Sequence, residues 1–133
     1  IKEAAEEESN FQVLYPDDAS LKDKIHAVAT KVYGADGVEY TAAADKQLAN
    51  YTAQGFDNLP VCIAKQHLSL SHDAKLKGAP TGWTLPVREV RASVGAGFVY
   101  PICGDIRTMP GLGTGPAAMQ IDIDDNGDIV NLS

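Results

Sequence analysis

The first half of the chain carries apolar residues at helical spacing. The first set, between residues 21 and 32, predicts a helix, because apolar residues three or four positions apart share one face. Ser20 and Asp23 have the spacing of a capping box at its start, and Gly34 follows its last turn, where a left-handed residue ends many helices. The residues expected on its buried face are Leu21, Ile25, Val28 and Val32.

A second helix is predicted over residues 42–54, capped by Thr41 and closed by Gly55. Its inward positions would be Ala44, Leu48 and Tyr51. Short strands are expected at 11–15 and 38–40, before each helix. This order of strands and helices predicts helices packed on a sheet.

The second half of the chain has the pattern of strands and turns. The continuous apolar run 59–64 predicts a buried strand, while 84–92 and 98–103 predict two strands joined by a bend at 93–97. Asn126-Gly127 between alternating segments predicts a closing hairpin. Asp122, Asp124 and Asn126 also match a calcium loop, but its twelfth position falls on Ser133 and its flanks alternate as strands do.

The predicted fold is therefore α/β (α+β), with a mixed sheet. Two packed helices lie in the N-terminal half, and a β-rich C-terminal half ends in a hairpin. With 133 residues, one domain (1–133) is expected, with a helical α/β part at 1–58 and a strand-and-loop part at 59–133. The acidic, helix-prone start without Met suggests a piece of a longer polypeptide.

Composition and charge exclude several classes of function. The net charge of −7 argues against binding to nucleic acid or to an anionic membrane surface, and no apolar run is long enough to span a bilayer. Cys62 and Cys103 lie in apolar runs, which predicts two reduced core thiols.

Several residues could carry chemistry. Lys65 ends a predicted strand, where ligands of α/β sheets collect, or it is a surface lysine. Trp83 could stack on a flat ring or anchor its glycine-rich loop to the core. Arg88 and Arg91 could clamp a phosphate or carboxylate, or pair with Glu89.

Other motifs are weaker. The Ser-His-Asp residues at 69–73 are too close in sequence to converge as a triad. The histidines and cysteines have no zinc spacing. The glycine segment 93–97 lacks the Gly-Lys-Ser/Thr ending of a Walker loop.

Taken in order, several segments resemble formate–tetrahydrofolate ligases, also called 10-formyltetrahydrofolate synthetases. The resembling segments are 58–65 (NLPVCIAK), 77–83 (KGAPTGW), 87–93 (VREVRAS), 95–98 (GAGF) and 108–112 (TMPGL), with 33–37 and 52–59 upstream. The likeness covers nearly the whole chain. The chain resembles the C-terminal part of such a ligase, possibly one within a C1-tetrahydrofolate synthase.

The chain also departs from the family pattern. Gln66 stands where Thr is usual, Trp83 where Phe is usual, and the segments 113–115 and 131–133 differ from the usual loop and tail. The family's glycine-rich, Lys-containing nucleotide loop and the aromatic groups around its folate would lie upstream of this segment.

The resemblance implies a ligase that uses ATP, with Mg, to join formate to tetrahydrofolate, giving 10-formyltetrahydrofolate, ADP and phosphate. It implies an inactive fragment that needs the rest of the ligase chain, in a homo-oligomeric enzyme of the cytoplasm or mitochondria. The alternatives are a stand-alone nucleotide- or folate-binding module and an oligomerisation module. As a hypothesis, the nucleotide base would lie against a loop, with Lys65 and Arg91 facing the same cleft. The loop residues are Pro80, Thr81, Gly82 and Trp83.

Overall fold

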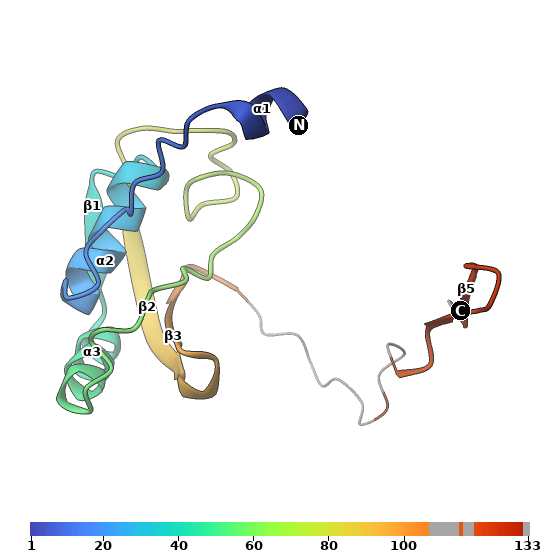
Figure 1. The fold of residues 1–133 in the computed structure, drawn as a ribbon. Coiled ribbons are helices and arrows are strands. Elements are labelled where there is room, and N and C mark those ends of the chain that lie inside the picture. Colours follow the sequence, from blue (N-terminus) through green and yellow to red (C-terminus); the bar gives the residue numbers. More distant parts are fainter. Residues whose placement is uncertain (107–114, 116–118, 132–133) are drawn as a thin grey trace.

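A three-stranded sheet covered on one face by two helices forms the centre of the computed structural model, which describes residues 1–106, 115 and 119–131. The strand order is β1-β2-β3, with β1 parallel and β3 antiparallel to β2. Figure 1 shows α2 and α3 on the same side of β2. The predicted α/β class with a mixed sheet is confirmed. In chain order the described elements are α1 (Lys2–Glu6), α2 (Leu21–Ala27), η1 (Val28–Val32), β1 (Gly37–Tyr40), α3 (Ala42–Ala53), β2 (Thr84–Ser93), η2 (Val94–Ala96), β3 (Phe98–Cys103), β4 (Asp122–Ile123) and β5 (Ile129–Val130).

The first predicted helix forms, but its second half is wound differently. The Ser20 side chain caps α2 by accepting a hydrogen bond from the Asp23 backbone N–H at 3.2 Å. After Ala27 the chain continues as η1, a π-helix with more residues per turn. This turns the apolar stripe, so Ala29 is fully buried and Val32 is half exposed. The expected burial of Val32 is therefore wrong.

The second predicted helix is confirmed. Thr41 caps α3 by accepting a hydrogen bond from the Ala44 backbone N–H at 3.1 Å. Ala44 and Leu48 are buried, and Tyr51 packs against the same core. The helix therefore presents the expected residues to the sheet.

The hairpin of β2 and β3 has the predicted bend, in which η2 is followed by Gly97 with a φ of 76°. Apart from this bend, the pairing contains one irregularity. Val87 pairs with Cys103, whereas Glu89 already pairs with Ile102, so Arg88 is an extra residue in a β-bulge. The bulge allows Val87 and Val90, three positions apart, to point into the same core.

Two predicted strands differ from the observed structure. Residues 11–15 form no strand, and Phe11 and Val13 are exposed. Residues 59–64 run along the edge of the sheet, with isolated bridges from Val61 and Ala64 to β3. This edge segment is only partly buried. A continuous apolar run is fully buried only where other elements pack on both of its faces.

The closing hairpin of β4 and β5 is confirmed. The Asp124 carboxylate accepts hydrogen bonds from the backbone N–H groups of Asn126 and Asp128 at 2.9 and 3.0 Å. These bonds lower the pKa of Asp124 by stabilising its charged form. The resembling segment 108–112 lies outside the described residues. Among those that are described, no helix is long and apolar enough to cross a membrane.

Candidate functional site

The face of the sheet opposite the helices contains a cleft with two arginines. Side chains alternate along a strand, so Glu89 and Arg91 of β2 share this face with their partners Ile102 and Tyr100 of β3. The cleft has a volume of about 600 Å³. Its lining residues are Ala64, Arg88, Glu89, Arg91, Tyr100, Ile102 and Ile106.

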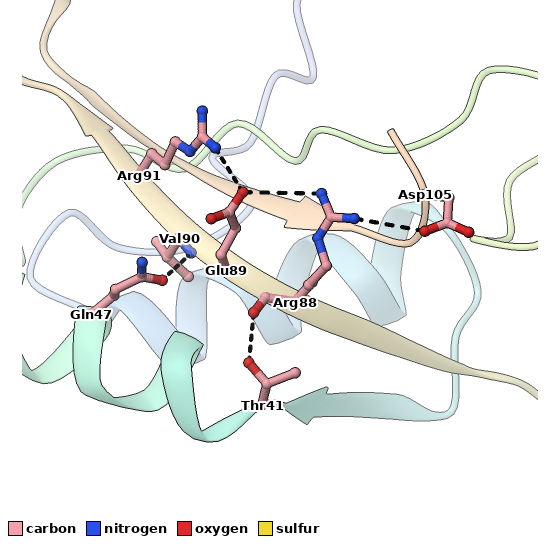
Figure 2. Close-up of polar contacts among 7 residues, drawn as sticks. All are labelled: Thr41, Gln47, Arg88, Glu89, Val90, Arg91 and Asp105. Atoms are coloured by element: carbon pink, nitrogen blue, oxygen red, sulfur yellow. Dashed lines mark hydrogen bonds and ion pairs between the residues drawn. The ribbon is translucent and has the colours of Figure 1, made fainter. Parts of the chain in front are cut away.

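One glutamate lies between the two guanidinium groups (Figure 2). Glu89 Oε1 is 2.9 Å from Arg91 Nη2 and 4.0 Å from Arg88 Nη2. Arg88 Nη1 is also 3.7 Å from Asp105 Oδ1. Both arginine side chains remain nearly half exposed, at 46% and 45%, so solvent or a ligand can reach them.

The β-bulge places these charges, and α3 holds the bulge. Strand β1 ends at Tyr40, so the β2 backbone beyond Val87 needs other partners on that side. Figure 2 shows the Thr41 hydroxyl donating to the Arg88 carbonyl and the Gln47 side chain accepting from the Val90 N–H. These bonds, at 2.6 and 2.7 Å, tie the arginine-bearing part of β2 to α3 and its N-cap, and α3 packs on the core through Ala44 and Leu48.

A second, more apolar hollow of about 320 Å³ adjoins the arginine cleft. The two share Ala64 and Tyr100 in their walls. The rings of Phe98 and Tyr100 lie 5.8 Å apart in a tilted arrangement. The two hollows therefore lie next to each other, with the arginines lining one and Phe98 lining the other, and together they are called the groove. The second hollow is lined by Cys62, Ala64, Ser93, Phe98 and Tyr100.

Lys65 turns its ammonium group toward its own loop. Its Nζ donates hydrogen bonds to the carbonyls of Ser69 and Gln66 at 2.6 and 3.1 Å and lies 4.9 Å from the centre of the Tyr33 ring. Loss of solvation lowers the pKa of Lys65. The side chain therefore stabilises the loop that follows the edge segment.

Trp83 is buried in the core, with 6% of its surface exposed. Its indole N–H donates to the Pro80 carbonyl at 2.9 Å, and its ring packs 5.8 Å from that of His72. The sequence left two roles open for Trp83, stacking on a ligand or anchoring its loop to the core. The structure shows the anchor. Thr81 and Gly82 remain exposed on the outside of the loop.

The structure does not gather the six candidate residues in one cleft. Arg91 lies seven residues after Thr84 along β2, which is roughly 23 Å in a strand. Trp83 and its loop precede Thr84, and Lys65 begins the loop that carries His72. Arg91 is therefore far from residues 80–83, and its neighbours are Glu89 and Tyr100.

Sequence reasoning missed a buried lysine in α2. Lys24 is fully buried, and its Nζ donates to the carbonyls of Asp57 and Leu59 at 2.7 and 3.2 Å. The ammonium group also lies 5.9 Å from the centre of the Tyr15 ring. The sequence did indicate that Lys24 could be buried, because Lys24 follows Leu21 by three positions and so lies on the apolar stripe of the helix.

The two cysteines differ in their surroundings. Both are free thiols, as predicted. Cys103 is buried, and burial raises its pKa to about 12. Cys62 is exposed on the edge segment, so its expected place in the core is wrong.

Comparison with known proteins identifies the family. The family model described as formate–tetrahydrofolate ligase matches residues 1–133. The chain belongs to the formate–tetrahydrofolate ligase family. A ligase of this name from Saccharopolyspora erythraea is 67% identical over 133 residues. Those from Cutibacterium acnes and Roseiflexus castenholzii are 60% identical over 129 residues and 56% identical over 131 residues.

These matches cover nearly all of this chain but a small part of each relative. They include 100%, 97% and 98% of the chain, and 24%, 23% and 23% of the three relatives. The chain thus spans about a quarter of the length of the curated relatives that it matches.

Proposed function

We propose that the whole protein containing this chain is an ATP-dependent ligase that joins formate to tetrahydrofolate. ATP, accompanied by Mg, would phosphorylate formate, and the N10 amine of tetrahydrofolate would then attack the formyl phosphate. The products are 10-formyltetrahydrofolate, ADP and phosphate. The observation that carries this proposal is the family match over residues 1–133, together with 67% identity to a named ligase.

In this proposal the chain supplies a wall of the substrate cleft and no phosphate cradle. Its glycine segment 93–97 forms the bend between β2 and β3 and is followed by a strand. A phosphate loop instead presents backbone N–H groups at the start of a helix. The arginine cleft offers positive charge to an anionic substrate, while the remaining groups for phosphoryl transfer would come from other parts of the ligase.

Turnover by the full-length protein tests the ligase activity. We expect 10-formyltetrahydrofolate to form only when ATP, formate and tetrahydrofolate are all present, and we expect none from residues 1–133 alone. Sedimentation of the full-length protein would test the proposed homo-oligomer, and cell fractionation the proposed cytoplasmic location. A full-length protein that binds ADP or folate without turnover would support the alternative of a binding module.

The hypothesis that the 80–83 loop faces the nucleotide needs a probe outside the core. Because Trp83 is buried, replacing it would disturb folding as well as binding. Thr81 is exposed, and Thr81→Glu would place a negative charge beside the nucleotide phosphates or base. We expect a several-fold higher KM for ATP in the full-length enzyme, with the KM for tetrahydrofolate unchanged.

The matched control is Thr52→Glu, at an exposed threonine on α3. It adds the same charge at a position outside the loop and should leave all three KM values unchanged. An unchanged KM for ATP in Thr81→Glu would remove the loop from the nucleotide site.

A further inference from the structure

The arginine cleft already holds a carboxylate, and it belongs to the protein itself. Glu89 Oε1 contacts both guanidinium groups, so the two groups lie side by side. Among the described contacts, Arg91 donates one hydrogen bond, to Glu89, at 2.9 Å. A guanidinium group has five N–H donors, so this pair of arginines can receive further oxygen atoms.

The charge of the cleft differs from that of the chain as a whole. Its lining contains two arginines and one glutamate, whereas the whole chain has a net charge of −7. Asp105 reaches Arg88 only at 3.7 Å, and its side chain is fully exposed. A local positive charge on an acidic protein favours an anionic ligand, because acidic surroundings would repel that ligand elsewhere.

The floor of the groove favours a carboxylate attached to an apolar, flat group over a bare phosphate. Tyr100 and Ile102 line the arginine cleft, and Phe98 lines the adjoining hollow. Among the described residues, no helix begins at the cleft to present its N–H groups to a phosphate. Planar guanidinium groups bind carboxylates through paired hydrogen bonds, and aromatic rings provide contact area for a benzoyl group.

We propose that this groove binds the p-aminobenzoyl-glutamate end of tetrahydrofolate. The glutamate carboxylates would accept hydrogen bonds from Arg88 and Arg91, and the benzoyl ring would lie against Tyr100 and Ile102. This inference rests on the proposed ligase function and names the substrate that the cleft receives. It leaves the reacting N10 amine to the part of the ligase that supplies formyl phosphate.

The test compares two folates in the full-length enzyme. Tetrahydropteroyl amide has the same ring system as tetrahydrofolate, but a neutral primary amide replaces the glutamate and its two carboxylates. In the double variant Arg88→Ala/Arg91→Ala, we expect the KM for tetrahydrofolate to rise roughly 10- to 100-fold, as expected for lost charge-assisted hydrogen bonds. The KM values for tetrahydropteroyl amide, ATP and formate should stay unchanged.

Two further variants show whether the effect is specific. Lys22→Ala removes an exposed cation that pairs with Asp45 at 2.6 Å on the helical side of the sheet, and it should change no KM. Arg91→Lys keeps the charge but loses the paired geometry, and it should fall between wild type and Arg91→Ala.

Each opposing outcome has a separate meaning. A higher KM for ATP with an unchanged KM for tetrahydrofolate would overturn the proposal in favour of a phosphate site. An equal rise for tetrahydrofolate and tetrahydropteroyl amide, or no change in either, would also overturn it. Absence of ligase turnover in the wild-type full-length protein would instead refute the proposed function itself.

Discussion

The two faces of strand β2 differ in burial and in charge. On the inner face, Leu85, Val87 and Val90 are fully buried against the helices. On the outer face, Arg88 and Arg91 are nearly half exposed and share a carboxylate. Neighbouring residues of one strand thus pack into the core on one side, and on the other side they are the residues proposed to bind the substrate. The difference should appear in stability for the first set and in substrate affinity for the second.

The largest expected effect comes from placing a charge on the inner face. Val90→Asp would bury an unpaired carboxylate, and we expect the free energy of unfolding to fall by at least about 4 kcal/mol. Urea denaturation of the 133-residue chain, followed by the fluorescence of the buried Trp83, measures it. Arg91→Ala, one residue along the strand, should change stability by about 0.5 kcal/mol or less. Similar losses in the two variants would contradict a division between the faces.

A smaller effect is expected from Lys24, the one lysine that is fully buried among the described residues. Lys24→Met keeps the length of the side chain but leaves the Asp57 and Leu59 carbonyls without their donor. We expect a loss of about 2 kcal/mol in the same measurement, from the carbonyls left unpaired. The exposed control Lys22→Met should lose less than about 1 kcal/mol. A more stable Lys24→Met variant would show that desolvation of the ammonium group outweighs its hydrogen bonds.

The inner face could be predicted from the sequence because apolar spacing and burial have the same period. Ser20, Thr41 and Asn126-Gly127 gave correct helix starts and a correct hairpin, since caps and turns depend on local chemistry. The exposure of Val32 was not predictable in this way, because the π-helical turn at Val28–Val32 shifts the stripe. The strand expected at 11–15 also failed, because alternation does not provide a pairing partner.

The candidate site was only partly predictable. Sequence alone indicated that Arg88 and Arg91 could bind an anion or pair with Glu89, and the structure contains the ion pairs. It did not reveal the bulge at Arg88, which depends on hydrogen bonds to Thr41 and to Gln47 through the neighbouring Val90. Nor did it separate Arg91 from residues 80–83, since proximity in the fold depends on which end of a strand each residue occupies.

The smallest change to the molecule comes from labelling its cysteines, and it compares the two faces directly. Cys103 points into the core, where burial raises its pKa to about 12, whereas Cys62 is exposed and lines the groove beside Tyr100. Alkylation needs an accessible thiolate, so iodoacetamide at pH 8 should modify Cys62 first and Cys103 only after unfolding. Peptide mass spectrometry of the native and urea-treated chain measures both sites. Equal modification of the two thiols under native conditions would mean that the inner face opens as readily as the outer one. In the full-length ligase, protection of Cys62 by tetrahydrofolate, but not by ATP or formate, would place the folate in this groove without any mutation.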